Sequence, residues 1–301
     1  MRIISLLSGA TEILFALGLG DHVVGVGHEC DYPPQVSNRP RLTLCHIDIN
    51  QQSQEIDQQV KSRLAEGRSL YEVKRDELIA LRPDLIVTQA QCDVCAVSYN
   101  EVIGIVSACP ELSNTQIVAL NPSSLDDVFA GIQSVADAAN VAPTGRQLNA
   151  ALRERLELVA TQAAAVRPTV ACIEWVSPLM FAGNWTPQLI EFAGGESQLA
   201  KANQPSEYAT FENLLDCNPE FIIVAPCGFD IERSLIETRD LQDHPRWTEL
   251  AAVQNRRVYV IDGNQYLNRS GPRLVDTVEI LANIIQGGRH ENAQWINLAA
   301  V

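Results

Sequence analysis

Residues 124–166, SLDDVFAGIQSVADAANVAPTGRQLNAALRERLELVATQAAAV, divide the chain into two segments of similar pattern. Apolar residues recur at helical spacing on both sides of Pro143, which cannot continue a helix because it lacks a backbone N–H. Thr144, with Gln147 three positions later, is typical of a helix start. The pattern predicts a helix from Gly145 to Val166 of roughly 33 Å, at about 1.5 Å per residue. Such a helix would be a rigid strut that permits closure of only a few degrees around a preformed cleft.

The segments on either side of this stretch repeat one order of elements. In the first, the strand pattern RIISLL (2–7) precedes a small-residue turn and a helix; in the second, TVACIEW (169–175) precedes a loop and a helix. Further along, LRPDLIV (81–87) is matched by CNPEFIIV (217–224), each reading as a helix end, a proline and a buried strand. The repeat predicts two α/β lobes that face each other across a ligand cleft.

These patterns also predict the limits of the lobes. We expect a first lobe over residues 1–122, connecting helices over 123–166 and a second lobe over 167–301. Residues from about 35 to 74 have no counterpart in the second lobe, so we expect them to form an insertion that contains one amphipathic helix.

Short local signals predict where individual elements start and end. Thr11 is expected to cap the first helix, and Ser69 with Glu72 to cap a helix that runs to Leu81. The polar C-terminal tail is expected to fray after Trp295.

The composition excludes several classes of protein. A chain of 301 residues with 46% hydrophobic content can fold into two domains with substantial cores. Its net charge of −15 argues against nucleic-acid binding, and no stretch reaches the ~20 apolar residues of a membrane span. Because Met1-Arg2 runs straight into the first strand, with no room for a signal peptide, we expect a cytoplasmic protein. If the native start carries a signal peptide that is removed, the protein is periplasmic.

Several motifs together resemble one known family. They are ISLLSGATEILFALGLG (4–20), VGV (24–26), DYPP (31–34), LRPDLI (81–86), FAG (181–183), AGGE (193–196) and RSGPRL (269–274). The chain resembles the vitamin B12-binding proteins, which are substrate-binding proteins of metal-chelate ABC importers. The resemblance covers nearly the whole chain outside the insertion.

The resemblance implies a class III periplasmic-binding-protein fold, in which two Rossmann-like α/β lobes are joined by one long helix. It implies that a cobalamin, another corrinoid, haem or another metal chelate is held between the lobes by aromatic side chains. Trp175 and Tyr266 match such aromatic positions, whereas Glu29 occupies a position that is usually aromatic. The resemblance places importer-docking acids at about Asp76 and at Asn268. An amide cannot pair with an arginine as a carboxylate does, so docking to an ABC importer is doubtful. The Cys92-Asp-Val-Cys95 loop and the insertion are absent from the usual importer proteins. With these features and without a signal peptide, the chain resembles a cytoplasmic branch of the family that is typically labelled cobalamin-binding.

Candidate ligand contacts are residues that follow strands or carry groups suited to a flat macrocycle with polar edges. They are His28, Glu29, Tyr32, Cys92, Asp93, Trp175, Trp185, Tyr266 and Arg269. The His28 imidazole could ligate cobalt or iron, and an ordinary hydrogen-bonded loop histidine is the alternative. Core packing is the alternative for the tryptophans. No nucleophile elbow, zinc-protease helix or phosphate-binding loop is present in the sequence, so we expect a non-catalytic protein that requires no cofactor.

The sequence Cys92-Asp-Val-Cys95 supports a second hypothesis. Two thiols at this spacing can bind a metal or form a redox pair, and Cys30 is the most plausible third ligand for zinc or iron. The alternative protein would be metal- or redox-active, either chelatase-like or cluster-bearing. Structural thiols or thiols that contact the ligand are the other interpretation.

Overall fold

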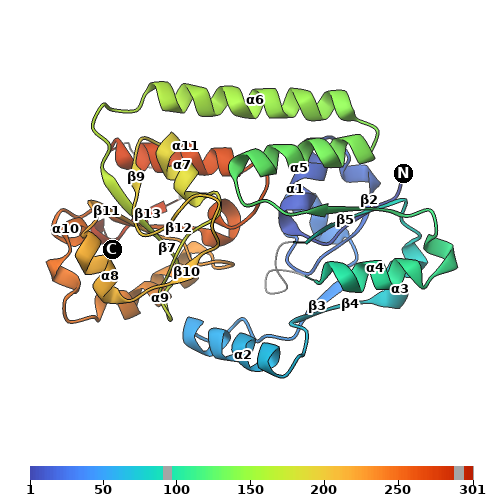
Figure 1. Ribbon diagram of the computed structural model, residues 1–301, viewed down its shortest axis with the longest axis horizontal. Coiled ribbons are helices and arrows are strands. Elements are labelled where there is room, and N and C mark those ends of the chain that lie inside the picture. The colour runs from blue at the N-terminus through green and yellow to red at the C-terminus, as the bar shows by residue number, and fades with distance from the viewer. Residues whose placement is uncertain (91–96, 288–294, 301) are drawn as a thin grey trace.

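The computed structural model describes residues 1–90, 97–287 and 295–300 and has the two-lobed α/β architecture that the repeat predicts (Figure 1). The first lobe is built on a four-stranded sheet with the order β2-β1-β5-β6, in which all strands are parallel. Its strands are β1 (Ile3–Ser5), β2 (Val23–Val26), β5 (Leu85–Gln89) and β6 (Gln116–Leu120). The helices of this lobe are α1 (Ser8–Ala16), α3 (Arg75–Leu81), α4 (Tyr99–Ser107) and α5 (Leu125–Ala138).

The second lobe is built on a larger, mixed sheet with the order β10-β8-β7-β11-β12-β13, and β9 also pairs with β7. Strands β7, β11 and β12 are parallel, and antiparallel strands extend the sheet at both edges. The strands are β7 (Thr169–Trp175), β8 (Met180–Phe181), β9 (Glu196–Ser197), β10 (Glu207–Tyr208), β11 (Phe221–Val224), β12 (Val258–Ile261) and β13 (Trp295–Asn297). The helices are α7 (Thr186–Phe192), α8 (Phe211–Cys217), α9 (Ile231–Gln242), α10 (Ala251–Gln254) and α11 (Leu274–Ile285).

Single-turn helices complete the described chain. They are the 3₁₀ helices Gly20–His22, Pro34–Asn38, Pro110–Leu112, Trp247–Glu249 and Leu298–Ala300, and the π-helix Gly263–Leu267. No helix in the described ranges is both long enough and apolar enough to cross a membrane.

The long helix of the connecting stretch is α6 (Ala142–Thr161), which passes above both lobes in Figure 1. It starts before the predicted Gly145 and ends before the predicted Val166, and Thr144 does not cap it, because Pro143 already occupies the first turn. Its 20 residues span about 30 Å. The helix packs on α5 and α11, and Arg155 pairs with two acids of α11 at 2.6 and 2.7 Å.

The insertion forms a small arm of its own. Strands β3 (Thr43–Cys45) and β4 (Tyr71–Val73) pair in an antiparallel ribbon, and α2 (Ser53–Ala65) lies beyond them. In Figure 1, α2 lies on the opposite side of the molecule from α6. The helix predicted to start at Ser69 is wrong in its first part, because Ser69 leads into β4 and α3 begins only at Arg75. The β-branched and aromatic residues after Ser69 favour the strand.

Two further predictions were wrong, one for the start of the first helix and one for the C-terminal tail. Helix α1 begins at Ser8, so Thr11 lies inside it and its hydroxyl bonds to Ser5, Leu7 and Cys30 instead of capping. The tail does not fray after Trp295, because β13 pairs with β12 and the Trp295 ring packs edge-on against Tyr259. Both residues gain tertiary partners that local sequence cannot reveal.

The core is shared between the lobes along the α6 side. One hydrophobic cluster contains buried residues of α1 and α5 from the first lobe and of α7 and α11 from the second. A second cluster lies in the first lobe and the insertion, yet it includes Phe229 from the second lobe. The lobes are therefore packed against each other as well as tethered.

Candidate functional site

Loops that follow strands of the two sheets meet between the lobes. The loop after β2 carries residues 28–32, and the loop after β12 carries Asn264 and Arg269. Asp31 accepts hydrogen bonds from Arg269 at 2.5 Å and from Asn264 at 3.0 Å. Open α/β sheets bind ligands at the carboxyl ends of their strands, so this meeting place is the candidate site.

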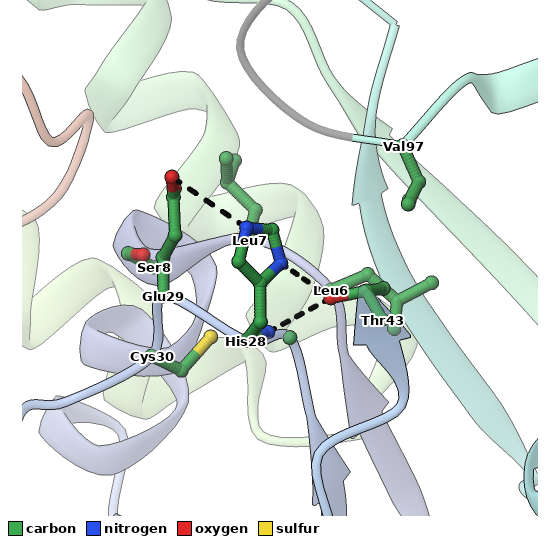
Figure 2. A pocket seen from close by; sticks show the side chains of 9 residues that line it. Leu6, Leu7, Ser8, His28, Glu29, Cys30, Thr43 and Val97 are labelled. Carbon is green, nitrogen blue, oxygen red and sulfur yellow. Dashed lines mark hydrogen bonds and ion pairs between the residues drawn. The ribbon is translucent and has the colours of Figure 1, made fainter. Parts of the chain in front are cut away.

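His28 is held from one side by Thr43 of the insertion (Figure 2). The Thr43 hydroxyl accepts the His28 backbone N–H at 2.8 Å and lies 2.7 Å from Nδ1. Donation of the hydroxyl proton to Nδ1 would place the ring proton on Nε2. Burial, together with the charge of Arg41, lowers the pKa of His28, so the ring is neutral. In that tautomer Nε2 is free to donate a hydrogen bond to a ligand and is not a metal ligand.

Glu29 faces His28 across the mouth of a small cavity. Its carboxylate lies 3.7 Å from His28 Nε2, which has no hydrogen-bond partner among the described residues. The Glu29 side chain is 54% exposed, yet burial raises its pKa. The carboxylate is in contact with water, while protein atoms surround it at longer range and raise its pKa. Glu29 therefore lies on the wall of a depression in the surface.

The cavity beside His28 is too small for a macrocycle. It is lined by Leu6, Leu7, Ser8, Gly27, His28, Glu29, Cys30, Thr43 and Val97, and holds about 10 Å³, which is room for about one water. This cavity is therefore not by itself the ligand cleft that the repeat predicts.

Cys30 is a buried structural thiol. Thr11 donates to its sulfur at 3.1 Å, and burial raises its pKa to about 11. A buried thiol with a raised pKa keeps its proton at neutral pH in the metal-free protein and is a poor nucleophile. No group of three or more histidine, cysteine or acidic side chains among the described residues is placed to hold a metal ion. Cys92, Asp93 and Cys95 lie outside the described residues, so the two-thiol hypothesis rests on sequence alone.

A buried charge cluster joins the lobes beside this cavity, and we call its members Glu12, Asp31, Arg269 and Arg273 the central cluster. Glu12 of α1 receives two hydrogen bonds from Arg273, at 2.6 and 3.0 Å, and lies 3.5 Å from Arg269. Burial raises the pKa of Glu12 against the opposing effect of the two arginines. Glu12 was missed in the sequence analysis, although a carboxylate within an apolar helix pattern is a signal for a buried partner.

Aromatic rings from both lobes cover Arg273. The Tyr32 ring lies 3.8 Å from its guanidinium, and the Tyr266 ring lies 5.8 Å from it on the second lobe. Tyr32 is 41% exposed, so one face of this pair remains accessible. The structure thus brings together Tyr32, Tyr266 and Arg269, three of the predicted site residues.

The backbones of the two lobes are in close contact at Gly9. A Cβ atom built on Gly9 would lie 2.7 Å from the backbone oxygen of Ser270 and 2.9 Å from its carbonyl carbon. Only a residue without a side chain fits between α1 and this part of the second lobe.

Trp175 and Phe229 form the apolar part of the same region. Trp175 ends β7 and donates its indole N–H to the Ser177 carbonyl at 3.1 Å. Its ring centroid is 5.3 Å from that of Phe229, and both pack against the first-lobe and insertion cluster. Phe229 was not anticipated, because its position depends on the path of the loop after β11.

Trp185 lies elsewhere. It is 8% exposed, packs in the large cluster shared between the lobes, and donates its indole N–H to the Leu267 carbonyl at 2.9 Å. The alternative interpretation, core packing, accounts for these contacts, and Trp185 is not carried into the site proposed below.

Asn268, the residue at the second supposed docking position, faces inward. Its amide donates to the carbonyls of Gly263 at 2.9 Å and Ala225 at 3.3 Å. The amide therefore braces the π-helix after β12. Asp76, at the first docking position, lies exposed in the first turn of α3.

The chain is similar to binding proteins over nearly its whole length. A family model described as "Periplasmic binding protein" matches residues 3–265. The vitamin B12-binding protein of Vibrio cholerae is 26% identical over 282 residues, which cover 92% of this chain and 86% of that protein. An uncharacterized ABC transporter substrate-binding lipoprotein of Bacillus subtilis is 24% identical over 291 residues, which cover 94% of this chain and 79% of that protein. The apo structure of the periplasmic haem-binding protein RhuT from Roseiflexus sp. RS-1 superposes with a TM-score of 0.71 at 20% identity, covering 95% and 98%.

These similarities do not support two of the sequence-based expectations. The matched proteins are described as periplasmic or as a lipoprotein, so the cytoplasmic location is not supported and the periplasmic alternative fits. One relative is described as an ABC transporter substrate-binding protein, so the doubt about importer docking is not supported either.

Proposed function

The chain belongs to the periplasmic binding protein family, whose members bind ligands and are not enzymes, and from that premise we propose that it binds a corrinoid between its two lobes. A related metal tetrapyrrole is the broader ligand class. The proposal is supported by the relatives named for vitamin B12 and, at the level of fold, by a haem-binding protein. We also propose that the bound ligand is delivered to an ABC importer.

One observation carries the proposal: aromatic side chains of both lobes converge where the strands end. Tyr32 comes from the first lobe, and Trp175 and Tyr266 come from the second. Aromatic faces provide a large contact area for a flat macrocycle, and they lose little rotamer entropy when they bind it. His28 and Glu29, on the loop beside them, offer a hydrogen-bond donor and an acceptor for polar groups at the edge of the ligand.

Titration of the purified protein with hydroxocobalamin, dicyanocobinamide and haemin tests the proposal. We expect at least one of them to bind with a shifted absorption spectrum and a raised melting temperature, because a ligand that binds the native state stabilises it. Absence of a spectral and thermal response to all three at high micromolar concentration would overturn the proposal.

A tryptophan variant locates the site. Trp175→Ala is expected to weaken binding about tenfold, because a large aromatic contact at the centre of an interface is typically worth more than 1 kcal/mol. Trp247→Phe is the matched control, since Trp247 is buried in a separate cluster of the second lobe. Equal dissociation constants for the Trp175 variant and the wild type would place the ligand elsewhere.

A further inference from the structure

The insertion crosses to the second lobe on the side opposite α6 (Figure 1). We call residues 46–70, which connect β3 to β4, the strap. Arg233 of α9 donates to the backbone carbonyls of Asn50 and Gln51, and Glu237 accepts the Ser53 backbone N–H at 3.2 Å. The strap thus forms a second connection between the lobes, far from the helical strut.

A second set of contacts holds the middle of the strap helix. The Tyr208 hydroxyl donates to Asp57 at 2.8 Å, and Lys61 lies 4.5 Å from the centre of the Tyr208 ring. Lys61 also pairs with Asp57 at 2.7 Å, which completes a three-residue cluster across the lobes.

The strap also packs in the apolar cluster that borders the cavity beside His28. Ile47 and Ile56 belong to the same buried cluster as Leu6 and Val97, which line that cavity, and as Phe229 of the second lobe. At its root, Thr43 of β3 bonds directly to His28. Movement of the strap would therefore disturb the packing beside the cavity and the support of its histidine.

The contacts at the strap can separate without leaving an uncompensated buried charge. Glu237 is 3% exposed, and Arg233 pairs with it at 2.6 and 2.9 Å within the same helix. When the strap leaves, Glu237 keeps its arginine and loses one backbone donor that water can replace. Separation of the central cluster would instead leave Glu12 without its two arginines, which is far more costly.

We propose that the strap is the gate of the interlobe site: it lifts from α9 and Tyr208 to admit a macrocyclic ligand, while the central cluster and α6 stay in place. This inference rests on the proposed function. It follows because the strap bridges the two lobes beside the cavity, its root bonds to His28, and its contacts with the second lobe separate without leaving a buried charge unpaired.

A gating strap predicts that the rate of ligand binding is limited by strap opening at high ligand concentration. In stopped-flow mixing with hydroxocobalamin, the observed rate should saturate as ligand concentration rises, because strap opening becomes limiting. The double variant Arg233→Lys, Tyr208→Phe removes the forked contacts to the strap carbonyls and the hydroxyl donor, but keeps the charge beside Glu237 and the aromatic ring. We expect its saturating rate to rise about tenfold, which corresponds to loss of about 1.4 kcal/mol of strap contacts. Arg246→Lys is the matched control, since Arg246 pairs only with acids of its own lobe.

Hydrogen exchange without ligand provides an independent readout. The Ser53 amide should exchange faster in the double variant than in wild type, while the Leu274 to Ile285 helix should not change. Faster Ser53 exchange with unchanged hydroxocobalamin kinetics would overturn the gate and leave the proposed function intact. Exchange of the wild-type Ser53 amide only by global unfolding would also overturn the gate. If wild-type protein binds none of the ligands titrated above, both the proposed function and the gate fail.

Discussion

The central cluster and the strap both hold the same two lobes together, but they do so with different physical means. In the central cluster, Glu12, Arg269 and Arg273 are buried, and each charge depends on a partner from the other lobe. At the strap, the buried acid Glu237 has its arginine on its own helix, and the contacts that cross between lobes are mainly to backbone groups and an exposed tyrosine. The difference teaches that the cost of separating a contact depends on where the compensating charge remains.

The largest effect is expected at Glu12. Glu12→Ala leaves Arg273 and one side of Arg269 buried without a carboxylate, which should lower the free energy of unfolding by about 3 to 5 kcal/mol. Urea denaturation followed by circular dichroism measures this quantity. Asp57→Ala, which removes the strap acid, should cost less than about 1 kcal/mol. Similar decreases in the free energy of unfolding for both variants would contradict the difference between the central cluster and the strap.

An intermediate effect is expected at Asp31, the half-exposed acid of the central cluster. Burial alone would raise its pKa, but the hydrogen bond and charge of Arg269, with Asn264, lower the pKa below its ordinary 3.8. A lowered pKa gives stability that is present above the ordinary value and is lost as the pH falls through the folded value. Asp31→Asn should cost about 1 kcal/mol at pH 7, allowing for solvent screening of a side chain that is 51% exposed.

The pH profile sharpens this prediction. Melting temperatures measured from pH 6 down to pH 2 should fall less steeply below about pH 4 in Asp31→Asn than in wild type, because the variant has no carboxylate to protonate there. Parallel profiles would show that Asp31 is not paired with Arg269 in solution.

The smallest effect is expected at Tyr208. Tyr208→Phe removes one exposed hydrogen bond to Asp57 but keeps the ring beside Lys61, so the free energy of unfolding should change by less than about 0.5 kcal/mol. The same urea experiment measures it. A loss above about 1.5 kcal/mol would mean that the strap is a structural brace of the native state.

The fold was predictable because it depends on repeated, long-range patterns. The strand Thr169–Trp175 was predicted with its observed bounds, and the existence of two helices beside Pro143 follows from the spacing of apolar residues. The predictions that were wrong concern single polar residues near element ends, such as Thr11 and Ser69. Their hydroxyls satisfy tertiary or strand contacts, and the local pattern of a cap is the same in either case.

The site was predictable in part. Loops at strand ends identified His28, Tyr32 and Arg269, because chain order determines where parallel strands end. The sequence could not pair Glu12 with Arg273, which is 261 positions away, nor reveal that Thr43 of the insertion bonds to the His28 ring. It also could not separate Trp185, which is in the core, from Trp175, which lies between the lobes, since both follow similar apolar runs.

Gly9 lets the two lobes approach closely because its side chain is a single hydrogen atom. Its place in a helix makes it a poor local choice, since glycine costs roughly 1 kcal/mol relative to alanine there. This glycine fixes the distance between the two lobes at this contact. The Ser270 backbone lies directly against it and cannot move aside as a flexible side chain could. In this chain, Gly9→Ala is therefore expected to push the two lobes apart at this contact without changing any charged group.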